Sequence, residues 1–213
     1  MKIDKHKPLP DHTNLDYDEC CALLILTELF PNQYSDLEIK DRPDLQSDEV
    51  GVEVTIADDR KHQEALNNWV KAYNCEDETK KQKYVERMQQ LGVKYTGGVQ
   101  TWGNYMPSVK MIYEAINKKI AKIENGNYRK YDKNEVFIFS DVWMHEPLVE
   151  KVKEYLHENS IFQSFSRVYL LEMGYILHAF TKDGYNVIEI DKTEQYDRNI
   201  RAREMVELAE EQD

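Results

Sequence analysis

The sequence predicts one α/β domain in which a mixed central sheet is flanked by helices. Segments with helical periodicity alternate with short segments rich in β-branched and aromatic residues. Their order is helix, three strands, helices, strand, helix, a strand meander and a final helix. The chain has 213 residues, of which 41% are hydrophobic, and this is enough for one sizeable core. We therefore expect residues 1–213 to form a single domain.

The elements of the first half are placed by capping residues, prolines and side-chain alternation. Residues 1–13 contain Pro8 and Pro10 among mixed charges, which predicts a flexible arm. The next predicted elements are a helix from Asn14 or Asp16 to about Phe30, a strand over 34–40, a short strand after Pro43, a strand over 51–57, and two charged helices over 58–91 with a break near 74–76.

The second half begins with a predicted loop at 95–107, where three glycines lie among aromatic residues. A helix then starts at Pro107 or Ser108 and ends at Asn125-Gly126. The remaining predicted elements are a buried strand over 134–141, a helix over 146–158, a meander of three strands with a hairpin at 182–184, and an acidic helix from Glu194.

Composition restricts the class of function. The net charge of −12 argues against a strong non-specific DNA binder, although it does not exclude a nuclease with clustered acids. No apolar run is long enough to span a bilayer, and residues 1–14 lack the apolar region of a secretory signal. The three cysteines are interpreted as reduced thiols of a cytoplasmic protein. The GxGxxG, GxxxxGK[ST] and GxSxG motifs are all missing from the sequence.

Two carboxylates lie in or beside predicted strands. Glu53 stands between Val52 and Val54, and Asp44 belongs to the preceding short strand. A solvated strand face would explain Glu53 alone. The hairpin between the strands, however, brings Asp44 and Glu53 side by side, where their charges repel unless a cation lies between them. Mg²⁺ suits such a pair because it prefers carboxylate oxygens and keeps several waters.

Two further charged residues fall on apolar helix stripes. Glu19 lies within the stripe of the first helix, although a wet acid in a first helical turn would also be stabilised by the helix dipole. Lys119 lies between Ile112, Ile116 and Ile123 on the helix that follows the glycine-rich loop. It either extends its amine to the rim of the core or pairs with buried acids such as Asp44 and Glu53.

These residues resemble the PD-(D/E)xK, or restriction-endonuclease-like, nuclease superfamily. Pro43-Asp44 matches the PD element, and Glu53-Val54-Thr55 occupies the (D/E)xK position. The resemblance covers residues 14–141, as helix, three strands, helix and strand, and leaves residues 142–213 as a C-terminal extension. The pattern PDLQ…GVEVT also resembles an uncharacterised group of bacterial and phage proteins, mostly from Gram-positive organisms.

The resemblance implies metal-dependent hydrolysis of phosphodiester bonds. Asp44 and Glu53 would bind Mg²⁺ or Mn²⁺, with Glu19 as a further ligand, directly or through water. Position 55 is threonine where the superfamily has lysine, and Lys119 would supply that charge from the following helix. If it does not, the expected alternative is a catalytically inactive nuclease-like binding, immunity or regulatory protein.

The segment 101–130 is the most basic region of this acidic chain and would contact nucleic acid. Lys110 and Lys122 are the candidate phosphate contacts, and Trp102 is a candidate for stacking on bases. An ordinary solvated helix with core aromatic residues is the competing interpretation. The sequence does not distinguish DNA from RNA and leaves the oligomeric state open.

Overall fold

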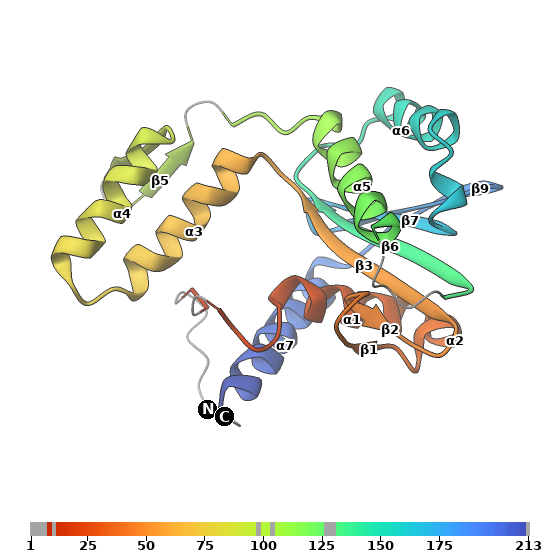
Figure 1. Cartoon of the computed structure of the whole chain (residues 1–213), viewed down its shortest axis with the longest axis horizontal. Coiled ribbons are helices and arrows are strands. Elements are labelled where there is room, and N and C mark those ends of the chain that lie inside the picture. The colour runs from red at the N-terminus through yellow and green to blue at the C-terminus, as the bar shows by residue number, and fades with distance from the viewer. Residues whose placement is uncertain (1–7, 10–11, 97–98, 103–104, 126–130, 212–213) are drawn as a thin grey trace.

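The computed structural model describes residues 8–9, 12–96, 99–102, 105–125 and 131–211, with the backbone alone for 94–96 and 99–102. Its main body is a mixed seven-stranded sheet between two layers of helices (Figure 1). The strand order is β1-β2-β3-β6-β7-β8-β9, and β4 and β5 form a separate pair. The strands are β1 (Glu38–Ile39), β2 (Leu45–Gln46), β3 (Val50–Ala57), β4 (Val93–Thr96), β5 (Val99–Trp102), β6 (Lys133–Ser140), β7 (Arg167–Glu172), β8 (Ile176–Thr181) and β9 (Gly184–Glu189).

The direction of pairing changes across the sheet. The first three strands are antiparallel, β3, β6 and β7 are parallel, and the last three are again antiparallel. The helices are α1 (Tyr17–Leu29), α2 (Pro31–Tyr34), α3 (Arg60–Asn74), α4 (Glu78–Gln90), α5 (Val109–Glu124), α6 (Glu146–Glu158) and α7 (Lys192–Glu210), with a 3₁₀ turn η1 at Ile161–Gln163. The coarse α/β prediction with a mixed sheet flanked by helices is therefore confirmed.

Each face of the sheet has its own apolar core. Helices α5 and α6 cover one face, where Ile112, Ile116, Val136 and Ile138 are buried. Helices α1 and α2 cover the other face, where they pack against Val52 and other buried residues of the sheet. Strand β3 is thus buried on both faces, so the alternative in which Glu53 belongs to a solvated strand face is wrong.

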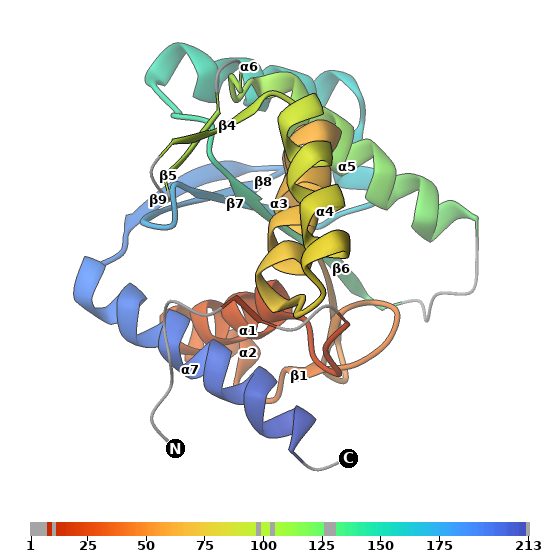
Figure 2. The same cartoon turned by 90° about the vertical axis from the view of Figure 1, so that its left-hand side faces the viewer.

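The C-terminal helix packs against the outer side of α1. Cys20 and Cys21 of α1 form a buried cluster with Ala202 and Val206 of α7. Figure 2 shows the two helices side by side below the sheet. In the predicted N-terminal arm, residues 1–7 and 10–11 lie outside the described residues, but Leu9 packs on this same cluster. The described part of the arm is therefore held against the fold.

Helices α3 and α4 project from the main body with the hairpin of β4 and β5 (Figure 1). They have a small cluster of their own, formed by Ala65, Ala72, Met88 and Val93. The prediction of a loop over 95–107 is wrong in its first half, because its residues include β5 and part of β4. The separating Gly97-Gly98, which lies outside the description, is a typical two-residue hairpin sequence. The loop prediction therefore missed the strand pairing on either side of this glycine pair.

One further difference concerns the segment before β2. The predicted strand over 34–40 is reduced to β1, because Pro31 begins the short helix α2, which ends at Tyr34. The break between the two charged helices falls at 75–77, as expected, where the Asp77 side chain accepts hydrogen bonds from the first backbone N–H groups of α4.

Candidate active site

Strand register brings the two carboxylates together at the end of β2. Leu45 lies opposite Val52 in the antiparallel pair, so continuing the register by one residue places Asp44 opposite Glu53. Asp44 Oδ2 accepts a hydrogen bond from the backbone N–H of Val54 at 2.7 Å. The carboxylate of Asp44 is thereby fixed against the middle of β3.

The amine of Lys119 joins the two acids. Lys119 Nζ donates to Asp44 Oδ2 at 2.9 Å and to Glu53 Oε2 at 2.6 Å. Because Asp44 Oδ2 and Glu53 Oε2 bond the same nitrogen, their separation cannot exceed these two distances added together. Lys119 is only 5% exposed, so the alternative in which its amine reaches the solvated rim is wrong. A buried ammonium group requires such partners, and Asp44 and Glu53 are the candidates that the sequence offered for the second alternative.

The cluster of Asp44, Glu53 and Lys119 contains more carboxylates than amines. Glu53 is 1% exposed, and none of the described residues hydrogen-bonds its Oε1 atom. Burial raises the pKa of Glu53, with a further contribution from Asp44, although Lys119 opposes the change. Burial alone would lower the pKa of Lys119, but Asp44 and Glu53 outweigh it and raise that pKa. The site therefore has an electrostatic preference for additional positive charge.

Glu19 lies close enough to this cluster to interact electrostatically with Asp44, Glu53 and Lys119. It occupies the first turn of α1 and is half-buried, so it is more than a wet acid at a helix end. Burial, followed by the charge of Asp44, raises the pKa of Glu19 to about 8, and Lys119 partly opposes this shift. A carboxyl in this position holds a proton at neutral pH unless another cation approaches.

The turn that carries Asp44 is held by residues that the sequence analysis did not identify. Gln46 Nε2 donates to the Pro43 carbonyl at 2.8 Å, and its Oε1 accepts from Tyr131 Oη at 2.6 Å. Gly51 lies directly against this turn, since a Cβ atom there would come within 2.6 Å of both Pro43 and Tyr131. A glycine inside a strand often marks a close approach of another segment. Gly51 was therefore the signal in the sequence that could have revealed the packing of this turn.

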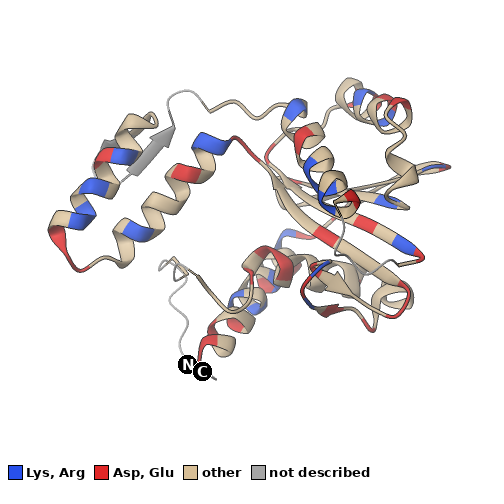
Figure 3. Cartoon of the chain, viewed as in Figure 1, with Lys and Arg blue, Asp and Glu red and all other residues tan. Residues whose placement is uncertain are grey.

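Of the three candidate residues for contact with nucleic acid, the structure describes the side chains of the two lysines only. Lys110 and Lys122 are both exposed on α5, and Figure 3 shows several basic positions along this helix. Lys110 Nζ lies 3.4 Å from Glu114, in an ion pair whose side chains are largely exposed. The side chain of Trp102 lies outside the described residues.

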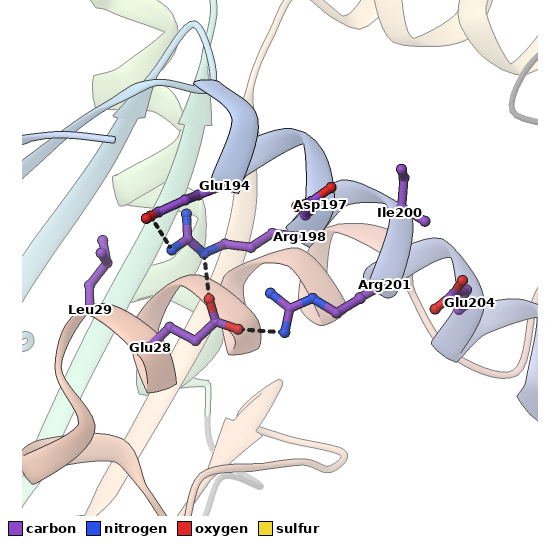
Figure 4. Close-up of a pocket in the computed structure, with 8 residues that line it drawn as sticks. All are labelled: Glu28, Leu29, Glu194, Asp197, Arg198, Ile200, Arg201 and Glu204. Carbon is purple, nitrogen blue, oxygen red and sulfur yellow. Dashed lines mark hydrogen bonds and ion pairs between the residues drawn. The ribbon is translucent and has the colours of Figure 1, made fainter. Parts of the chain in front are cut away.

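A second charged cluster lies in a pocket between α1 and α7 (Figure 4). Arg198 Nε donates to Glu28 Oε2 at 2.8 Å, and Arg201 Nη1 lies 2.6 Å from Glu28 Oε1. Although burial alone would raise it, hydrogen bonds from Arg201 and Arg198 lower the pKa of Glu28. Because Glu28 on α1 contacts both arginines of α7, we assign this cluster to the packing of α7 rather than to catalysis, although Arg198 Nη1 is buried without a hydrogen bond to a described residue.

Comparison of the chain with protein-family models, curated proteins and solved structures finds no match in any of the three. Among the described residues, no helix has the length and apolar character needed to cross a membrane. The same part of the chain contains no group of three or more His, Cys, Asp or Glu side chains arranged to hold a metal ion. Its three cysteines are free thiols, two of them buried.

Proposed function

We propose that this protein is a metal-dependent nuclease that hydrolyses phosphodiester bonds of nucleic acid. The observation that carries the proposal is the contact of Lys119 with both Asp44 and Glu53. Lys119 supplies from α5 the amine that the PD-(D/E)xK pattern has at the position occupied here by Thr55. The elements α1, β1 to β3, α5 and β6 follow the order of helix, three strands, helix and strand that the resemblance implies, with α2 inserted after α1 and α3, α4, β4 and β5 inserted between β3 and α5.

The residues present are compatible with a site for Mg²⁺ or Mn²⁺ that uses two carboxylates. Mg²⁺ commonly binds one or two carboxylates and retains water for its other positions, so a cluster of three protein ligands is not required. The buried Oε1 of Glu53 has no described hydrogen-bond partner and is available as a ligand atom. Asp44 and Glu53 would hold the ion, and Glu19 would contribute directly or through water. When bound, the ion would lower the pKa of a coordinated water and neutralise charge on the phosphate.

Lys119 has two roles in this proposal. In the absence of metal, its ammonium group neutralises part of the charge of Asp44 and Glu53. During hydrolysis it would donate hydrogen bonds to the attacking water or to the phosphate oxygens, where negative charge accumulates. Thr55 can donate a hydrogen bond but carries no charge, so it does not replace the amine.

The proposal is tested by incubating the purified protein with plasmid DNA, single-stranded DNA or RNA in the presence of Mg²⁺ or Mn²⁺. We expect cleavage of at least one substrate, and loss of at least about a hundredfold in rate for Asp44→Ala. Lys83→Ala, which removes an exposed lysine from α4, is the control. Cleavage that persists in Asp44→Ala would show that the activity comes from a contaminant.

A second candidate function is a nuclease-like binding, immunity or regulatory protein without catalysis. The specific observation in its favour is that Lys119 already bonds both acids, so the cluster is partly neutralised without a metal. The net charge of −12 points the same way. No cleavage of any substrate, together with no metal-induced rise in melting temperature, would favour this candidate. For either candidate we propose a cytoplasmic location, because the free thiols are typical of a reducing compartment.

A further inference from the structure

A pocket of about 660 Å³ opens where β3 ends and where α3 and α5 begin. We call it the β3–α5 pocket. Its lining includes Thr55 on β3, Arg60 on α3 and Lys118 on α5. Its volume lies within the range of about 300–1,000 Å³ that is usual for sites of small ligands. In Figure 1, the beginnings of α3 and α5 flank the upper end of β3.

The β3–α5 pocket is adjacent to the candidate active site. Thr55 follows Glu53 by two residues on one strand, so the two side chains lie on the same face of the sheet. Lys118 precedes Lys119 on α5, with its side chain exposed where that of Lys119 is buried. A ligand in the pocket would therefore extend toward Asp44, Glu53 and Lys119.

The acidic residues of the pocket are engaged by neighbouring groups. Asp58 pairs with His62, one turn into α3. Asp59 caps α3, where its Oδ1 accepts from the Lys61 backbone N–H at 2.7 Å. Glu114 pairs with Lys110. These contacts reduce the repulsion that the three acids would exert on an anion.

Two basic residues of the pocket have no such partner. Arg60 and Lys118 are exposed, and neither forms an ion pair or side-chain hydrogen bond with any residue that the structure describes. The beginning of α5 also lines the pocket through Ser108, whose side chain makes no capping hydrogen bond. The positive end of this helix therefore adds to the attraction of Arg60 and Lys118 for an anion.

We infer that the β3–α5 pocket binds the phosphate of a nucleotide next to the scissile bond. Arg60 and Lys118 would contact the phosphate oxygens, and the open pocket would hold the nucleoside. The inference rests on the proposed function, because it places one unit of a nucleic-acid strand beside the metal-binding acids. The substrate would then be a nucleic-acid strand with one phosphate bound by two cationic side chains, although the net charge of the protein is negative.

The test measures binding of thymidine 5′-monophosphate and of inorganic phosphate by titration calorimetry in metal-free buffer. We expect the double variant Arg60→Ala/Lys118→Ala to bind the nucleotide at least about tenfold more weakly than the unaltered protein. The matched control is Lys80→Ala/Lys83→Ala, which removes the same charge from exposed positions on α4 and should bind normally. A nucleotide affinity equal to that for inorganic phosphate would restrict the pocket to a phosphate site and overturn its assignment to a nucleotide.

Asp44→Ala separates this inference from the proposed nuclease activity. It removes a metal-binding acid but leaves the lining of the pocket intact, so nucleotide binding should persist while cleavage is lost. Nucleotide binding by a protein that cleaves nothing would reject the nuclease and retain the pocket. Cleavage without binding, or equal binding by both double variants, would reject the pocket and retain the nuclease.

Discussion

Lys119 Nζ lies 2.6 Å from Glu53 Oε2, although 66 residues separate them in the chain. This contact joins α5 to the centre of β3 inside the protein. The second bond of Lys119, to Asp44, adds the turn directly before β2 to the same cluster. Three elements of the fold are thus held by one amine.

Replacing Lys119 with methionine should strongly destabilise the protein. The substitution keeps the length of the side chain but leaves two neighbouring carboxylates without their buried cation. Loss of one partner from a buried ion pair typically costs about 3–5 kcal/mol. We expect a decrease of this size in the free energy of unfolding, measured by urea denaturation in metal-free buffer. Lys118→Met, at the exposed neighbouring position, should change stability by less than about 0.5 kcal/mol. Equal stability of the two variants would contradict the importance of the cluster.

Glu19 should make the stability of the metal-free protein depend on pH. Its pKa is raised from 4.5 to about 8 in the folded protein, so the folded state binds a proton more tightly than the unfolded chain. Its contribution to stability is full below pH 4.5 and is lost as the pH rises to about 8. Glu19→Gln should remove this dependence and raise the melting temperature by a few degrees at pH 8.5, but not at pH 4.5. Parallel curves for the two proteins would show that Glu19 does not titrate in this way.

Gly51→Ala should disturb the turn that carries Asp44. The added methyl group would come within 2.6 Å of Pro43 and Tyr131, and the Tyr131 ring is tied to Gln46 by its hydroxyl hydrogen bond. Overpacking of this kind typically costs about 1–3 kcal/mol, measured by denaturant unfolding. Because Pro43 precedes Asp44, we also expect metal-dependent cleavage to fall further than the loss of folded protein explains. Gly184→Ala is a suitable control, since its nearest contact would be 3.8 Å away. If both alanine variants behave alike, the close approach at Gly51 has no effect on the site.

The sequence predicted most helices and strands because their periodicity and capping residues are local signals. Asp16 and Ser108, for example, lie at the helix starts expected of them. The proximity of Asp44, Glu53 and Lys119 was also predictable, because a polar residue on an apolar face must find a partner. Gln46 and Tyr131 were missed because their hydrogen bond spans 85 residues and leaves no periodic pattern. The hairpin of β4 and β5 was missed because its glycines were interpreted as loop residues.

The packing of α7 on α1 has a consequence for synthesis of the protein. Cys20 and Cys21 near the start of the chain are covered by Ala202 and Val206 near its end. Glu28 receives its two arginine partners, Arg198 and Arg201, from the same late segment. During synthesis, the first helix therefore has no outer cover until α7 has left the ribosome. The layer below the sheet can close only then, so a nascent chain stalled before residue 192 would leave those thiols accessible to a cysteine-reactive label.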